Sequence, residues 1–111
     1  MRRLPKRMMP HGGLVSYRAK LGEGTYGPQH DDVEVVPKRA AIDDKRKLIR
    51  TADGRELMSQ SRIALDLEHL MPVGSLVTIW RGRANERETT ALVVAVADWP
   101  GLPQFVEIAL E

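Results

Sequence analysis

The side chains that could bind a metal ion are scattered along this chain. His11, His30 and His69 lie far apart in the sequence, and none has a second nitrogen or carboxylate ligand at the short local spacings typical of zinc sites. Cysteine is absent, so there is no thiolate ligand either. We therefore expect no bound metal, and we interpret the three histidines as solvated or loop residues.

Two adjacent pairs of carboxylates could in principle serve as acid and base or as magnesium ligands. These pairs are Asp31–Asp32 and Asp43–Asp44. Neighbouring residues on a strand point to opposite faces, so neither pair can converge on one reacting atom, and we assign both to turns and rims. No histidine is placed to activate a serine such as Ser16 or Ser59. We expect a non-enzyme with no catalytic residues.

Residues 22–27 read GEGTYG, which has the G-x-G-x-x-G spacing and locally resembles the glycine-rich loop of protein kinases. A kinase also needs an H-R-D and a D-F-G motif, and neither is present. In a dinucleotide-binding fold the glycines open a helix, whereas here Pro28 and the β-branched run Val33–Val36 follow. We therefore expect a flexible surface loop and no nucleotide or other cofactor.

The segment Lys45–Leu57, KRKLIRTADGREL, has the pattern of a basic β-hairpin. Its Asp-Gly step suits a two-residue type I′ turn, in which both central residues need a positive φ. That turn sets Ile49 opposite Met58 and leaves neither face of the hairpin apolar. We therefore expect a hairpin over about residues 43–65 that projects from the body and is stabilised by contact with something else. The residues it would present are Lys45, Arg46, Lys47, Arg50, Asp53, Gly54 and Arg55.

The same register sets Lys45 opposite Arg62, and like charges directly opposite one another are destabilising. An anionic partner would relieve this repulsion, and it could be nucleic-acid phosphate or an acidic protein surface. A bulge near Lys45 would relieve it as well. The residues alone leave these alternatives open.

The first 13 residues contain two prolines, two glycines and no periodicity, and positions 1–20 hold no acidic residue. We expect an extended basic N-terminal arm over residues 1–13. Its basic residues include Arg2, Arg3, Lys6 and Arg7.

The rest of this 111-residue chain indicates one all-β domain over residues 14–111, a small antiparallel barrel or sandwich. Strands are expected at 14–19, 33–36 running on through 40–42, 76–80, 89–97 and 105–110, with one helical turn at 67–70. Trp80 and Trp99 are expected to pack at the end of the barrel. No apolar run is long enough to cross a bilayer and no signal peptide is evident, so we expect a soluble, unexported chain. The expected core is Val77, Ile79, Leu92, Val94, Val96, Val106, Ile108 and Leu110.

Several short segments resemble, in their order and spacing, the head-to-tail stopper (head closure) proteins of long-tailed bacteriophages, especially those of actinobacterial hosts. They are MRRLPKRMMPH at 1–11, YGP at 26–28, DDKRKLIRTADGREL at 43–57, MPVGSLVTI at 71–79 and GLPQFVEIALE at 101–111. The resemblance covers nearly the whole chain. It departs at residues 80–90, WRGRANERETT, a stretch that is longer and more charged than the family pattern.

This resemblance implies a structural virion protein, assembled in the host cytoplasm and located at the head-tail interface. It implies a small β-barrel that forms a homo-oligomeric ring of roughly six or twelve copies. The ring would lie between the portal and adaptor proteins and the tail terminator or tail tube proteins, close the DNA-filled capsid and provide the tail docking surface. The resemblance also implies that the hairpin residues named above face the central channel or a neighbouring subunit, and that the basic arm orders on a neighbouring ring. Packaged DNA in the channel is a further expected partner, and contact with a membrane is not expected. The alternative is a small β-barrel nucleic-acid-binding protein that uses the same positive charges.

Overall fold

The computed structural model describes residues 5–24, 27–51, 53–98 and 100–111. Over these residues the chain is built of β-strands with two single turns of 3-10 helix, which confirms the all-β fold class. A search of the same residues for a helix long and apolar enough to cross a membrane finds none. The elements are η1 (Lys6–Met8), β1 (Val15–Arg18), β2 (Lys20–Gly24), β3 (Gly27–His30), β4 (Ala40–Asp43), β5 (Lys47–Arg50), β6 (Glu56–Ser59), β7 (Ser61–Asp66), η2 (Leu67–His69), β8 (Leu76–Ile79), β9 (Arg87–Ala97) and β10 (Phe105–Leu110).

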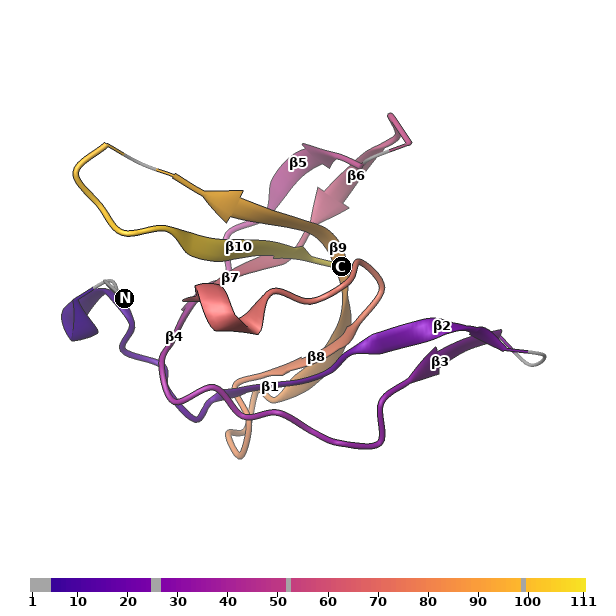
Figure 1. Ribbon diagram of the computed structural model, residues 1–111, viewed down its shortest axis with the longest axis horizontal. Coiled ribbons are helices and arrows are strands. Elements are labelled where there is room, and N and C mark those ends of the chain that lie inside the picture. The colour runs from indigo at the N-terminus through magenta and orange to yellow at the C-terminus, as the bar shows by residue number, and fades with distance from the viewer. Residues whose placement is uncertain (1–4, 25–26, 52, 99) are drawn as a thin grey trace.

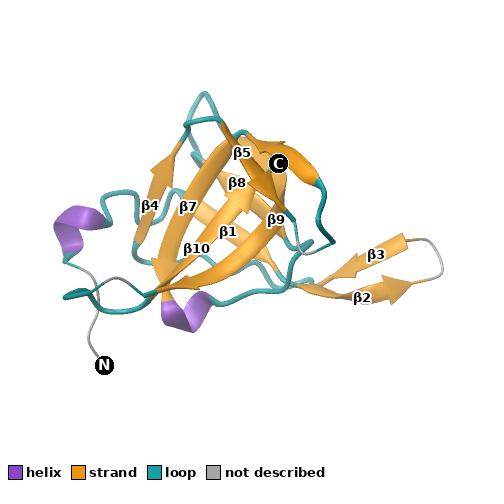
Figure 2. Cartoon of the chain, turned by 90° about the horizontal axis from the view of Figure 1, so that it is seen from above, coloured by secondary structure: helices purple, strands orange, loops and turns teal. Residues whose placement is uncertain are grey.

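Six of the described strands form one antiparallel sheet in the order β1-β8-β9-β10-β7-β4. The sheet curls into an incomplete barrel, which Figures 1 and 2 show from two directions. Two isolated bridges narrow the gap between its edge strands, one joining Pro10 to Ala40 and one joining Tyr17 to Val35. The expected strand at 33–36 is therefore reduced to a single bridged residue, and Pro37 after it is buried.

The core lies inside the curl of the sheet, where alternate residues of each strand point inward. Leu65 on β7, Ile79 on β8 and Ile108 on β10 have no more than 1% of their surface exposed. Burying each such side chain contributes about 1.5–3 kcal/mol to folding. Five of the eight expected core residues are fully buried, namely Val77, Ile79, Val106, Ile108 and Leu110.

The prediction of core residues on β9 is only partly correct, because the pairing of this strand with β10 contains a bulge. Val94 lies opposite Ile108, but Leu110 lies opposite Ala91, so the register shifts between Ala109 and Leu110. One extra residue in a strand reverses the alternation of its side chains. Ala91 is consequently buried and Leu92 only half-buried, while Val96 at the open end of the sheet is 44% exposed.

The prediction of an extended arm over residues 1–13 is wrong for its second half. Residues 6–8 form η1, Met9 is buried, and the His11 amide donates to the Ala40 carbonyl at 2.8 Å. This segment therefore belongs to the barrel wall. Of the residues expected to dock the arm, Arg2 and Arg3 lie outside the described residues, Lys6 lies in η1, and Arg7 is exposed.

Residues 20–24 and 27–30 pair as a second hairpin, β2–β3, where we expected a flexible loop. Two contacts hold its base to the barrel: the Lys20 amide donates to Ser75 Oγ at 3.1 Å, and His30 Nε2 lies 2.9 Å from the Gly74 carbonyl oxygen. From this base the hairpin extends away from the body, at the right of Figures 1 and 2. The glycines that suggested a loop are tolerated in this short ribbon, since Gly22 adopts a φ of 153° beside a bulge.

Candidate functional site

The basic hairpin is present as β5–β6, but its register differs by one residue from the expected one. Ile49 lies opposite Leu57, and Arg50 lies opposite Glu56. The connection is a three-residue loop, because the Thr51 amide donates to the Arg55 carbonyl and the Gly54 amide donates to the Thr51 carbonyl. Gly54 supplies the positive φ, 84°, that such a loop needs at its third residue. The predicted type I′ turn is therefore wrong.

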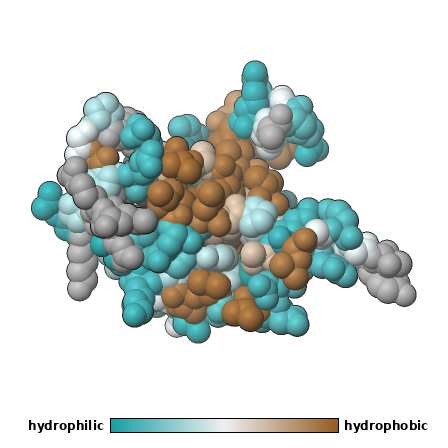
Figure 3. Space-filling view, in the orientation of Figure 1, coloured by the Kyte–Doolittle hydropathy of each residue, from teal (hydrophilic) through white to brown (hydrophobic). Residues whose placement is uncertain are grey.

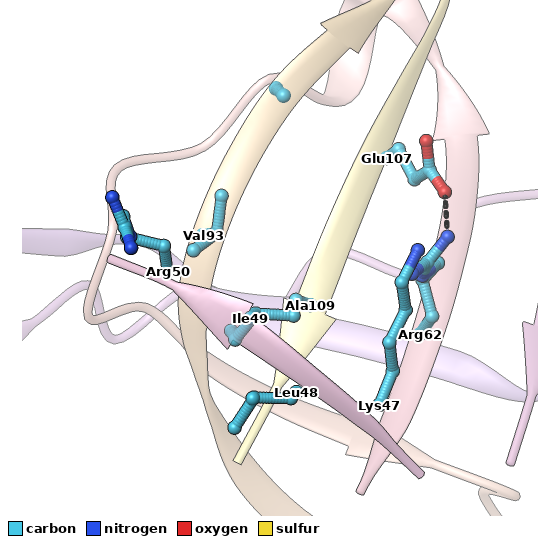
Figure 4. Close-up of a pocket in the computed structure, with 9 residues that line it drawn as sticks. Lys47, Leu48, Ile49, Arg50, Arg62, Val93, Glu107 and Ala109 are labelled. Carbon is cyan, nitrogen blue, oxygen red and sulfur yellow. Dashed lines mark hydrogen bonds and ion pairs between the residues drawn. The ribbon is translucent and has the colours of Figure 1, made fainter. Parts of the chain in front are cut away.

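In the observed register the hairpin has an apolar inner face, whereas the sequence analysis predicted that neither face would be apolar. Ile49 and Leu57 are both half-buried and share the face turned toward the barrel. Figure 4 shows β5 crossing over the outer side of the sheet, with Ile49 above Ala109 and near Val93. The hairpin also covers fewer residues than expected, since residues 61–66 belong to the main sheet.

A gap of about 380 Å³ separates the base of the hairpin from the sheet beneath it. Lys47 and Arg50 border it from above, and Val93 and Ala109 form part of its floor. The packing between hairpin and barrel is therefore incomplete, and the gap is bordered mainly by cationic and small apolar side chains.

The hairpin carries two apolar side chains that the described residues leave about half exposed, and one of them, Leu48, also borders the gap beneath β5. Leu48 is 56% exposed and Met58 is 45% exposed, and they lie directly opposite each other. Arg50 and Glu56 continue this face toward the tip. A cross-strand apolar pair in the centre of an exposed ribbon is a candidate contact for a partner.

The predicted repulsion between Lys45 and Arg62 does not occur. Arg62 lies opposite Asp43 in the sheet, and its Nη1 is 2.6 Å from Glu107 Oε1. Lys45 follows the end of β4, so it has no partner across a ladder. The like-charge argument for an anionic partner is therefore overturned.

The positive charge of the hairpin is nevertheless divided unevenly along its length. Near the tip, Arg55 Nε is 2.9 Å from Asp53 Oδ2, and Arg50 is paired with Glu56 at 3.5 Å. The hydroxyl of Thr51 donates to Asp53, and this bond, followed by the Arg55 charge, lowers the pKa of Asp53. At the base, Lys45, Arg46 and Lys47 are exposed and form no ion pair with the residues that the structure describes. The available cations are therefore gathered where the hairpin leaves the barrel; this group is called the basal triad below.

Asp44, which sequence analysis assigned to a rim, anchors this base. Its carboxylate accepts from Ser61 Oγ and from Trp80 Nε1, both at 2.8 Å. Trp80 packs against the core as expected, and its ring meets the His11 ring edge-on at 5.0 Å between centroids. Asp44 thus links β7, the loop after β8 and the start of the hairpin. No local sequence signal marks this role, because its partners lie far away in the chain.

Replacing Asp44 with Ala should lower the free energy of unfolding by about 1–3 kcal/mol, since it leaves the buried Ser61 hydroxyl and the Trp80 indole without their acceptor. Asp98→Ala removes an exposed carboxylate and is the matched control. Chemical denaturation of the two variants measures the difference. Equal midpoints would show that Asp44 does not hold the base.

The other polar candidates have structural contacts. His69 Nδ1 is 3.1 Å from the hydroxyl of Tyr17, whose pKa is raised by burial and also by the nearby Glu68 carboxylate. Like His11 and His30, His69 is half-buried and hydrogen-bonded, which corrects our interpretation of the histidines. Asp31 accepts from the Val33 amide in a local turn. Within the described ranges, no three potential ligands group as a metal site would require. Trp99 lies outside those ranges.

Comparisons of the chain with protein-family models, with curated proteins and with solved structures find no match.

Proposed function

We propose that this protein is a structural component of a bacteriophage virion, a head-to-tail stopper that forms a ring between the portal and adaptor proteins and the tail. The observation that carries the proposal is the hairpin β5–β6, which leaves a curled barrel and presents half-exposed apolar side chains together with cations that form no ion pair with the described residues. The segment resemblance supplies the class of assembly. The all-β fold agrees with that class.

The exposed pair Leu48 and Met58 supports the role of an intersubunit element. Fully burying such a side chain is worth about 1.5–3 kcal/mol, and these two side chains are 56% and 45% exposed, so roughly half of this gain remains to be made at an interface. In a ring, each hairpin would meet the same surface of the next copy, so the gain would be repeated at every interface. If the rotation between neighbouring copies brings the last copy back to the first, assembly stops at a closed ring.

The basal triad supports contact with something acidic. Each copy in a ring would contribute the same cations at the same height, which concentrates the positive potential. Packaged DNA in a central channel and an acidic face of a neighbouring connector protein are both suitable partners. The protein would act through binding and closure, as a non-enzyme.

Deletion of the gene from its phage tests the proposal. We expect heads that fill with DNA but lose it and fail to join tails, and we expect added purified protein to restore joining. Electron microscopy of the particles and nuclease sensitivity of their DNA are the readouts. Normal, infectious particles from the deletion strain would refute the role.

Binding of free nucleic acid is the second candidate function, favoured because the basal triad forms no ion pair with the residues that the structure describes. If these three residues contact phosphates, the logarithm of the DNA association constant should fall with the logarithm of salt concentration with a slope of about −3. Against strong binding, residues 43–59 hold five basic and four acidic side chains. Titrations over a salt series distinguish a DNA binder from a connector that ignores free DNA.

A further inference from the structure

Strand β9 has a free edge along half of its length. Strand β8 pairs with it only from Arg87 to Thr90, and backbone bonds between residues 74–75 and Ala91 extend this pairing by one residue. From Leu92 to Ala97 the strand pairs with β10 on one side. Among the described residues, none hydrogen-bonds to its other side. This free edge of residues 92–97 is a row of backbone donors and acceptors available to another strand.

A groove lies beside the first half of this free edge, from Leu92 to Val94. It has a volume of about 430 Å³ and lies between β9 and the distal half of the β5–β6 hairpin. Leu57, Val73, Leu92 and Val94 contribute apolar side chains to its walls. Figure 3 shows an apolar area in the middle of this face of the molecule. An occupant would therefore gain side-chain burial as well as backbone pairing.

Together these features fit an extended segment added to the sheet by β-augmentation, in which main-chain hydrogen bonds provide affinity and neighbouring pockets accept alternate side chains. A helix could not satisfy the free backbone groups of β9. The occupant therefore needs an open strand edge of its own.

The β2–β3 hairpin has one such edge. Pro28 lies opposite Glu23, and a proline nitrogen must face away from its partner strand because it has no hydrogen to donate. The outer edge of β3 therefore lacks a donor at this site. The outer edge of β2 keeps its donors, and from Leu21 to Gly24 no described residue bonds to it.

The dimensions and surroundings of β2 match the free edge. It has five residues, against the six free residues of β9, and its glycines let another backbone approach closely. Leu21 is 66% exposed and would enter an apolar environment. In its own molecule the hairpin extends away from the body, so the free edge it can reach belongs to another copy.

We propose that strand β2 of one copy adds to the free edge of β9 of the next copy, which extends the six-stranded sheet across the subunit interface. The contact is heterologous, since each copy uses its β2 hairpin on one side and its β9 edge on the other. That these contacts close into a ring rests on the proposed function. The pairing of β2 with β9 can be tested with the purified protein alone.

The chain contains no cysteine, so introduced thiols report the contact directly. We expect purified Leu21→Cys protein mixed with Val96→Cys protein to form a heterodimer with a short thiol cross-linker, increasingly as concentration rises. The matched control replaces the first partner with Leu70→Cys, another exposed leucine, which lies on neither hairpin. Cross-linking no better than this control, or only between like variants, would overturn the proposal.

A second pair of variants separates backbone pairing from side-chain effects. Both Glu23→Pro and Glu23→Ala remove the 2.7 Å ion pair with Lys20, but only the proline removes the outward-facing backbone donor. Carried into the Leu21→Cys protein, Glu23→Pro should weaken the association by about fivefold to tenfold, and Glu23→Ala should leave it largely intact. Equal loss in both would contradict edge pairing, provided that circular dichroism shows both folded.

Hydrogen exchange identifies the occupant. Residues 92–97 should become protected as the concentration of the purified protein rises. Protection that appears only when purified heads are added would assign the edge to a head protein and overturn self-pairing. Because these measurements use the isolated chain, their failure is distinguishable from failure of the head-completion experiment.

Discussion

Replacing Lys45, Arg46 and Lys47 together with Gln should leave the protein fully folded and abolish tail joining. The three side chains are exposed and form no ion pair with the described residues, so their replacement with Gln mainly changes surface charge. Surface substitutions of this kind usually alter stability by less than about 0.5 kcal/mol. Their repetition around a ring would multiply the loss of attraction to an acidic partner.

The matched control is the double variant Arg50→Gln, Arg55→Gln. These cations lie on the same hairpin, but Glu56 and Asp53 already neutralise them. The control should therefore retain most tail joining. Counting tailed particles by electron microscopy and testing DNA retention with nuclease measure both variants, and thermal unfolding confirms that both are folded. Normal joining by the triple variant would exclude the basal triad from the function.

The strands of the sheet were predictable from local patterns. The β-branched and aromatic runs at 76–80, 89–97 and 105–110 correspond to β8, β9 and β10, and the one expected helical turn is η2. Each run has its turn residues close by, so the chain itself signals where a strand ends. The fold class followed from these elements.

The hairpin register was not predictable, because Asp-Gly suits both a two-residue turn and the end of a three-residue loop. The difference of one residue moved Ile49 and Leu57 to a shared inner face and removed the supposed clash with Arg62. The bulge in β9 was likewise not predictable from the local sequence. In both cases one residue decides which face a side chain occupies, and contacts from distant strands fix that residue.

The anchoring of residues 9–13 had no local signal either. A segment with prolines, glycines and no periodicity is typical of an arm, yet it closes the barrel through backbone bonds to residues 37–40. This finding also changes the expected effect of truncation. Removal of residues 1–9 would take away buried Met9 and weaken the barrel, whereas deletion of a free arm would leave the fold intact.

Gly12→Ala should therefore be among the most damaging single substitutions, lowering the free energy of unfolding by about 2–4 kcal/mol. A Cβ at this position would lie 2.0 Å from the backbone oxygen of Lys38. The neighbours on both sides hold the two backbones together, through His11 to Ala40 at 2.8 Å and Gly13 to Pro37 at 3.1 Å. Neither backbone can move away without losing these bonds.

Gly24→Ala is the matched control, because its added methyl group meets only the flexible side chain of Gln29. Thermal unfolding and the exchange rates of the His11 and Gly13 amides measure both variants. We expect Gly12→Ala to unfold at a lower temperature and to lose protection at both amides, since separation of the two segments opens the barrel between β1 and β4. If Gly12→Ala were as stable as Gly24→Ala, residues 11–13 would not close the barrel, and a free basic arm would again be the better description.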